Sequence, residues 1–255
     1  MNQKIAIEAI CKTIIDDKNV EAIFVQGESA EEYFDEHSII DLYLVVERSK
    51  MDYVLDKRYE YLESYKQIIH HFFVFFSCPQ IVAIYEDGLR INLYISTLEN
   101  LQVYGKMVII YDPKNVLDNF PCKNYSLLPK EAGEYFNTFN YTLLDFISAY
   151  LRNDIPYAFR LASHLFSDIS TIFRIISDPN NAKLGLKGLY KVLDRDLKEK
   201  IYEIMKEFSY DNLLQTVLLM VSIIDSLIMR MPLEIAQYIN YDFHVICKKK
   251  LLSIV

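Results

Sequence analysis

The spacing of apolar residues changes near Leu128, and this change constrains the fold more than any other feature of the chain. Before it, short apolar runs alternate with turn-like segments, which is typical of strands mixed with helices. After it, apolar residues recur only at helical spacing. The sequence therefore predicts an α/β domain with a mixed β-sheet over residues 1–125 and an all-α helical bundle domain over residues 126–255. A chain of 255 residues is long enough for two such domains.

Strands are expected at six short apolar runs of the first half, which read AIFVQG, IIDLYLVV, HHFFVFF, QIVAIYE, LRINLYIS and KMVIIYD. Asp87-Gly88 separates the fourth and fifth runs and is the two-residue signature of a hairpin turn. Amphipathic spacing predicts helices in the first half over residues 2–17 and 50–70 and in the second half over residues 131–152, 156–176, 194–208, 211–230 and 233–250.

Composition narrows the classes of partner and compartment. The formal charge is 27 minus 35, or -8, which argues against a nucleic-acid surface because contact with phosphates relies on clustered Lys and Arg. The most apolar window, from Leu213 to Met229, contains Asp225 and several other polar residues, so we expect a buried bundle helix and no membrane span. The N-terminal segment lacks the unbroken apolar core of a secretion signal. We therefore expect a cytoplasmic protein.

Neither the cysteines nor the histidines form a recognisable metal motif. His37 is isolated, and His70-His71 precedes an expected strand without other ligands nearby, so these residues are expected to be structural or exposed. The cysteines are too far apart in the sequence to suggest a zinc site or a disulfide framework, being Cys11, Cys78, Cys122 and Cys247. Their spacing fits a reducing compartment.

Two segments of the first half carry a motif-like pattern. The first reads VQGESAEEYFDEHSIIDLYLVV and the second reads YEDGLRINLYISTLENL. Together they resemble the nucleotidyltransferase superfamily, in the branch of aminoglycoside 6-adenylyltransferase and streptomycin adenylyltransferase. In that family a strand ends in Gly-Ser, a loop follows, the next strand carries Asp-x-Asp, and a later hairpin carries a third carboxylate. With the helical second half, the resemblance extends over nearly the whole chain.

The resemblance implies Mg²⁺ and ATP as cofactors of a working enzyme. Alternate residues of a strand face the same way, so Asp-x-Asp places two carboxylates side by side, and a third from the neighbouring strand completes an oxygen cage for Mg²⁺. The metal neutralises the phosphates of the nucleotide and aligns the attacking hydroxyl, while the Gly-Ser turn lets backbone donors approach a phosphate. The matching positions are Gly27, Glu28 and Ser29 for the nucleotide and Asp41 for the metal.

The acidic set is incomplete in this chain. Ile39 occupies the first position of the Asp-x-Asp pair, Asp41 retains the second, and Asn92 occupies the third. Ile cannot bind a hard cation, and Asn offers a neutral oxygen that cannot act as a base. In the turn, Glu28 follows Gly27 directly and displaces Ser29 by one position, so a carboxylate there would repel a triphosphate. These departures predict a catalytic motif that is degenerate at Asp41, Asn92 and Ile39.

Structural interpretations of the same residues stay open. Gly27 is also what an ordinary turn after a strand requires. A carboxylate in an apolar strand needs partners, so Asp41 fits a structural hydrogen bond as well as an inherited functional role, and Asn92 is a candidate partner. Substitute carboxylates for the metal are available in the loop at Glu28, Asp35 and Glu36, although acidic loop residues are usually only solvated.

Three functions follow from this pattern. The first is a catalytically impaired pseudoenzyme with a nucleotidyltransferase fold. Such a protein would act in binding of a small-molecule ligand or in regulation. The second is an active, Mg²⁺-dependent nucleotidyltransferase that moves a nucleoside monophosphate from an NTP to a hydroxyl of a small, aminoglycoside-like acceptor. The third is an interaction protein that forms a homo-oligomer through its helical half.

Overall fold

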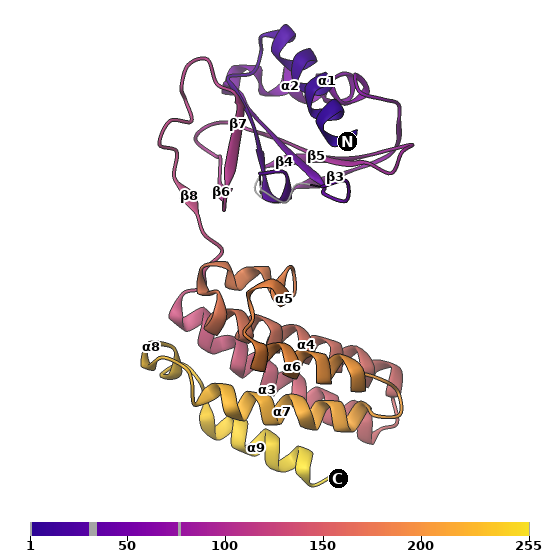
Figure 1. Ribbon diagram of the computed structural model, residues 1–255, viewed down its shortest axis with the longest axis vertical. Coiled ribbons are helices and arrows are strands. Elements are labelled where there is room, and N and C mark those ends of the chain that lie inside the picture. The colour runs from indigo at the N-terminus through magenta and orange to yellow at the C-terminus, as the bar shows by residue number, and fades with distance from the viewer. Residues whose placement is uncertain (1, 31–34, 76–77, 255) are drawn as a thin grey trace. The chain divides into compact units, whose positions relative to one another are not determined.

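A computed structural model describes residues 2–30, 35–75 and 78–254 of the chain, with only the backbone described at Glu28 and Ser29. The chain divides into two compact units, Met1–Asn124 and Tyr125–Val255 (Figure 1). The first unit combines a mixed sheet with helices, and the second consists of helices.

A six-stranded mixed sheet forms the centre of the first unit. Its strand order is β3-β4-β5-β2-β1-β7. Strands β2 and β5 pair in parallel, whereas the other neighbours pair antiparallel. The strands are β1 (Ala22–Gln26), β2 (Ile40–Val45), β3 (Ile68–Phe75), β4 (Pro79–Tyr85), β5 (Arg90–Ser96) and β7 (Met107–Tyr111). The β1–β2 connection begins with a 3₁₀ turn, η1 (Gly27–Ala30).

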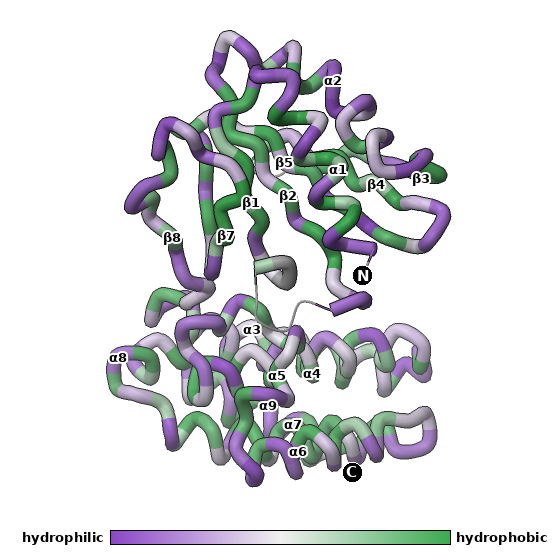
Figure 2. The backbone as a smooth tube through the Cα atoms, turned by 45° about the horizontal axis from the view of Figure 1, so that its top comes forward, coloured by the Kyte–Doolittle hydropathy of each residue, from purple (hydrophilic) through white to green (hydrophobic). Residues whose placement is uncertain are grey.

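Two helices, α1 (Asn2–Asp17) and α2 (Met51–Glu63), cover one face of this sheet. They lie side by side in Figure 1. A second short 3₁₀ turn, η2 (Arg48–Lys50), leads into α2. Alternate residues of the central strands, such as Leu42 and Leu93, pack with Ile10 and Leu62 of the helices into one buried cluster. Figure 2 shows the apolar colouring of these central strands. This face is the apolar core of the unit.

The opposite face of the sheet is apolar only toward one end. There Phe24 and Val45 pack against Leu101, Val103 and other side chains of the segment that follows β5. This segment contains two short parallel strands, β6 (Val103–Tyr104) and β8 (Cys122–Lys123). The other end of the same face carries polar residues and forms the candidate site.

The first unit differs from the sequence expectation in two places. The helix expected over residues 50–70 ends at Glu63, and β3 begins already at Ile68. The β4–β5 hairpin is present, but Tyr85 bonds to Leu89 across three turn residues instead of two. Gly88 takes the left-handed conformation in that turn, with φ of +77°, as in a three-residue hairpin loop that ends in a left-handed residue.

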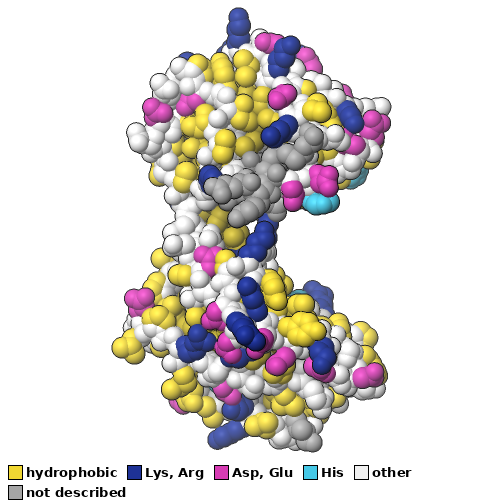
Figure 3. Space-filling model, in the orientation of Figure 1, with side chains coloured by type: hydrophobic (Ala, Val, Ile, Leu, Met, Phe, Trp, Pro, Cys, Tyr) yellow, Lys and Arg dark blue, Asp and Glu magenta, His cyan; other side chains and the backbone are white. Residues whose placement is uncertain are grey.

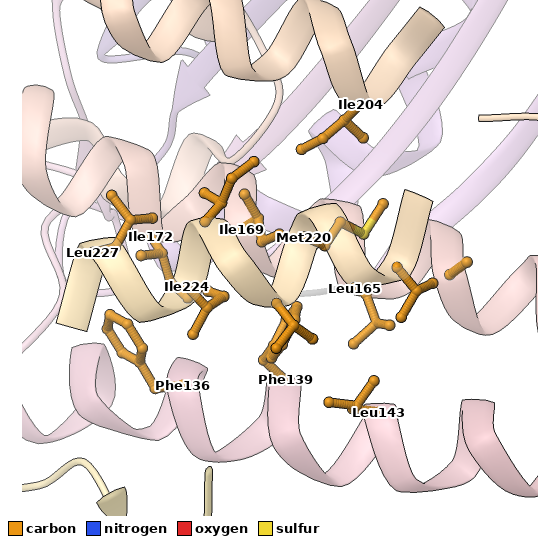
Figure 4. Close-up of a cluster of buried hydrophobic side chains, with 14 of the residues drawn as sticks. Phe136, Phe139, Leu143, Leu165, Ile169, Ile172, Ile204, Met220, Ile224 and Leu227 are labelled. Atoms are coloured by element: carbon orange, nitrogen blue, oxygen red, sulfur yellow. The ribbon is translucent and has the colours of Figure 1, made fainter. Parts of the chain in front are cut away.

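The second unit is a bundle built on two long helices. Its helices are α3 (Pro129–Leu151), α4 (Ile155–Ser177), α5 (Leu189–Val192), α6 (Arg195–Glu207), α7 (Leu213–Ile228), α8 (Leu233–Ala236) and α9 (Tyr241–Leu252), with the 3₁₀ segment η3 (Pro179–Leu184). Side chains from α3, α4, α6 and α7 point toward one another in its core, as Figure 4 shows for Phe139, Leu165, Ile204 and Met220. The apolar window of the sequence is α7, whose buried side chains belong to this core.

The helix expected over residues 233–250 is in fact two helices, α8 and α9. Asn240 begins the second one, because its Oδ1 accepts a hydrogen bond from the backbone N–H of Phe243 at 3.0 Å. The residues before it are packed closely against α3, where a Cβ on Gly133 would lie 2.6 Å from Cβ of Tyr238. Among the helices of the described residues, none is long and apolar enough to span a membrane.

Candidate functional site

Asp41 and Asn92 lie opposite each other on the polar part of the open sheet face. The parallel pairing of β2 and β5 puts the two residues in register. On the other side of β2, antiparallel pairing with β1 puts Gln26 opposite Asp41. Because residues in register point to the same face, the three side chains form a row across the sheet. Gln26 is 6% exposed and its Oε1 finds no hydrogen-bond partner among the described residues.

A hydrogen bond joins the two residues directly. Nδ2 of Asn92 donates to Oδ1 of Asp41 at 2.6 Å, and Nε of Arg90 donates to Oδ1 of Asn92 at 3.2 Å. A guanidinium cannot accept and an ionised carboxylate cannot donate, so these two neighbours fix which way the amide points. The amide oxygen that could have bound a metal therefore faces Arg90, and its nitrogen faces Asp41.

Tyr94 adds a second donor to the same carboxylate. Its hydroxyl lies 3.5 Å from Oδ1 of Asp41, at the long limit of a hydrogen bond. Burial, and next the charge of Asp41, raise the pKa of Tyr94 to about 12, so the phenol keeps its proton at neutral pH. The ring is held by stacking, because it lies 4.2 Å from Tyr43, which in turn stacks on Phe24 at 4.8 Å.

Gly27 leaves room for the carboxylate. Its φ is +68°, a conformation that residues with a Cβ rarely adopt. A Cβ built at this position would lie 2.9 Å from Oδ2 of Asp41. The glycine is therefore required both by the turn that ends β1 and by the close approach of Asp41. The side chains of Glu28 and Ser29, which were candidates for nucleotide binding, lie outside what the structure describes.

Ile39 precedes β2 and contributes no donor or charge through its side chain. Asp35, a carboxylate of the loop before it, closes a local turn. Its Oδ1 accepts from the backbone N–H of His37 at 2.9 Å and from the hydroxyl of Ser38 at 3.0 Å. These two hydrogen bonds lower the pKa of Asp35, and the bond from the backbone of His37 has the larger effect. Asp35 is thus used in its own loop, and Glu36 is exposed to solvent.

A polar pocket of about 670 Å³ opens beside this end of the sheet. It is lined by residues of α1, of the loop before β2 and of the β4–β5 turn, among them Gln3, His37, Ile39, Asp87 and Arg90. Gln3 is 2% exposed, and its Oε1 has no hydrogen-bond partner among the described residues. Arg90 connects the pocket to Asp41 through Asn92.

The described residues do not form a site that fits Mg²⁺. No group of three or more His, Cys, Asp or Glu side chains among them is placed to hold a metal ion. At Asp41, one oxygen accepts from Asn92 and Tyr94, and the other faces Gly27. His70 and His71 lie exposed on β3, away from other potential ligands.

Sequence reasoning missed Arg90 and Tyr94. Both residues are two positions from Asn92 on the same strand, and strand alternation places all three on one face. The two-residue alternation of strands could have identified Arg90 and Tyr94 as neighbours of Asp41. It could not have shown that Arg90 holds the amide oxygen, because that contact depends on the rotamer of a long side chain.

Comparison with known proteins finds similarity among solved structures. No protein-family model matches the sequence, and no curated protein matches it significantly. The structure is similar to that of an aminoglycoside 6-adenyltransferase from Bacillus subtilis, with 12% sequence identity over 98% of this chain and 97% of that chain. The TM-score is 0.45. A similarity at this level assigns neither the activity nor the ligand of this chain.

Proposed function

We propose that this chain is a nucleotidyltransferase-like protein that has lost metal-dependent nucleotide transfer and acts by binding a small-molecule ligand beside Asp41. One observation carries the proposal, namely the 2.6 Å hydrogen bond from Asn92 to Asp41. A residue that donates to the remaining carboxylate stands where the nucleotidyltransferase pattern expects the third metal ligand.

The chemistry of transfer explains why this bond matters. Transfer of a nucleoside monophosphate needs a metal to offset the charge on the phosphates, and the metal needs several anionic oxygens. Here the neighbouring oxygen of Asn92 accepts from Arg90, and its amino group points at Asp41. A cation bound to Oδ1 of Asp41 would meet an N–H donor and lie close to a guanidinium. Both contacts oppose binding of Mg²⁺.

The pocket beside Arg90 supports a binding role. Its volume of about 670 Å³ is in the range of small-molecule sites. Gln3 supplies a buried oxygen without a partner among the described residues, and a ligand that donates a hydrogen bond would satisfy it. Arg90 and His37 offer donors for an anionic or polar group at the other side of the pocket. The ligand we propose is therefore a polar small molecule with both donors and acceptors.

Calorimetric titration with ATP tests the loss of catalysis. We expect the affinity for ATP, if measurable, to be the same with Mg²⁺ and with EDTA, and we expect no adenylylated product from an aminoglycoside. Tight binding that requires Mg²⁺, together with product formation, would refute the proposal. Arg90→Gln should weaken any metal-independent binding, because Arg90 lines the pocket.

The retention of Asp41 favours active transfer as the second candidate. In that case Asp41 would hold the metal together with a carboxylate from the loop. Asp41→Ala would then abolish turnover while the protein stays folded, which activity and circular dichroism would show together. A homo-oligomer formed through the helical unit stays a prediction, and light scattering after size exclusion would test it.

A further inference from the structure

A small apolar pocket lies between α2 and the sheet, on the face opposite to the candidate site. Its volume is about 280 Å³, close to the lower limit for pockets that hold small molecules. Its lining is mostly apolar and includes Leu55, Phe73, Phe75, Pro79, Ile81 and Ile95. Among the described residues that line it, Arg58 alone carries a formal charge.

Arg58 is held at the wall of this pocket by two kinds of contact. Its Nη1 donates to the backbone carbonyl of Leu55, one turn earlier on α2. Its Cζ lies 4.7 Å from the ring centroid of Phe73 and 5.5 Å from that of Tyr59. Cation–π contacts of this kind stabilise the position of a guanidinium but use none of its N–H groups as hydrogen-bond donors.

The guanidinium has an unused donor. Nε of Arg58 is buried, and no acceptor for it is found among the described residues. No described carboxylate forms an ion pair with the group either. A buried donor on a cation without an acceptor is unfavourable, so such a group in a folded protein points to a missing partner.

The geometry points to a second binding site in this pocket, for a small amphipathic monocarboxylate. A carboxylate presents two oxygens that match the fork of a guanidinium, so it would satisfy Nε and neutralise the charge together. The alkyl or aryl part of the same molecule would fill the apolar lining. A water molecule would satisfy Nε alone and leave the charge unpaired beside apolar walls. This inference does not depend on the proposed function, because the two pockets share no lining residue.

Calorimetric titration of the full chain with three eight-carbon probes tests the inference. Sodium octanoate should bind at least about tenfold more tightly than 1-octanol, because only the carboxylate can pair with Arg58. Octylammonium should bind more weakly than 1-octanol, because its charge is repelled. Equal affinities for octanoate and 1-octanol, or no measurable binding of octanoate, would overturn the inference.

Variants on α2 locate the site. Arg58→Gln should weaken octanoate binding about ten- to a hundredfold and leave binding of 1-octanol unchanged. Lys57→Gln is the matched control, since this neighbouring cation pairs with Glu60 at 2.5 Å and does not line the pocket, and it should bind octanoate as the unmodified chain does. Arg58→Lys keeps the charge but loses the forked donor geometry of the guanidinium. This variant replaces Arg58→Gln in the titration if Arg58→Gln does not fold. Unchanged octanoate affinity in a folded Arg58 variant would refute the assignment.

Discussion

The two units each contain a carboxylate held by side-chain donors, but the donors differ. In the helical unit, Asp225 accepts from Lys248 at 2.6 Å, and its other oxygen lies 2.9 Å from Nε2 of His244. In the sheet unit, Asp41 accepts from the neutral groups of Asn92 and Tyr94. The first cluster pairs a carboxylate with a cation, whereas the described side-chain donors to the second carboxylate are neutral.

This difference separates a cluster that joins helices from one that lies within a single sheet. The cluster at Asp225 fastens α9 to the bundle, because His244 also contacts Asn140 of α3, with 2.8 Å between Nδ1 and Oδ1. The cluster at Asp41 joins strands that the sheet already pairs through their backbones. Removing Asp41 should therefore cost the fold less than disrupting the Asp225 cluster.

The largest effect is expected from His244→Ala. His244 is 1% exposed, so the substitution leaves a cavity and removes the contacts to Asn140 and Asp225. The free energy of unfolding should fall by about 3 kcal/mol in urea denaturation. His164→Ala, at an exposed position on α4, is the control and should change it by less than about 0.5 kcal/mol. Similar values for the two variants would contradict the structural role of the cluster.

Gly27→Ala should cost about 2 kcal/mol, from the left-handed backbone and from the contact of the new Cβ with Asp41. Gly88→Ala is the matched control. It has a similar φ but no atom within 4 Å of the new Cβ, so it should cost only about 1 kcal/mol. Chemical denaturation measures both. In the Asp41→Ala background, Gly27→Ala should cost no more than Gly88→Ala does, because the contact with the carboxylate is gone. If the losses of stability from Gly27→Ala and Asp41→Ala simply add in the double variant, Asp41 does not cause the strain.

Asn92→Asp replaces the donor with a second carboxylate close to Asp41. Like charges at this distance repel, so the variant should lose about 1–2 kcal/mol of stability at neutral pH. Because one of the two carboxyl groups then binds a proton more readily, the loss should shrink as the pH falls toward 4. Thermal melts of the variant and of the unmodified chain at several pH values measure this loss of stability. A variant as stable as the original chain at neutral pH would mean that the bond between Asn92 and Asp41 contributes little.

The smallest effect is expected from Asp225→Asn. Burial raises the pKa of Asp225, but the hydrogen bonds from Lys248 and His244 outweigh it and lower the pKa overall. A lowered pKa stabilises the fold above the pKa of the unfolded chain, about 3.9, and this stability is lost as the pH falls through the folded-state pKa. The side chain is 33% exposed, so solvent screening limits the loss to about 1 kcal/mol at pH 7. The melting temperature of this variant should lie below that of the unmodified chain at pH 7 and approach it at pH 3. The exposed control Glu203→Gln should melt as the unmodified chain does at both pH values.

Some of this architecture could be predicted from the sequence for clear physical reasons. Strand alternation and the turn residues Asp87 and Gly88 locate the hairpin. Asn92 was a candidate partner of Asp41 through the family resemblance alone, and the parallel register of β2 and β5 confirms the pairing. Over the face shown in Figure 3, Lys and Arg side chains lie among Asp and Glu side chains. The absence of a nucleic-acid partner stays a prediction.

Other features could not be predicted because they depend on tertiary contacts. The break before α9 arises where Tyr238 packs against Gly133, two residues more than a hundred positions apart. The use of Asp35 in its own turn depends on the rotamers of Ser38 and Asp35. The pocket at Arg58 depends on the distance between a helix and a sheet, which periodicity does not determine.

We propose that Asn92 and Tyr94 occupy Asp41 where a metal would otherwise bind. Titration with Mn²⁺, followed by calorimetry, tests it in the unmodified chain and in the double variant Ile39→Asp/Asn92→Asp, which restores the expected carboxylates. We predict no binding at Asp41 in the unmodified chain and a gain of binding in the double variant. Binding of Mn²⁺ by the unmodified chain that disappears in Asp41→Ala would contradict the account.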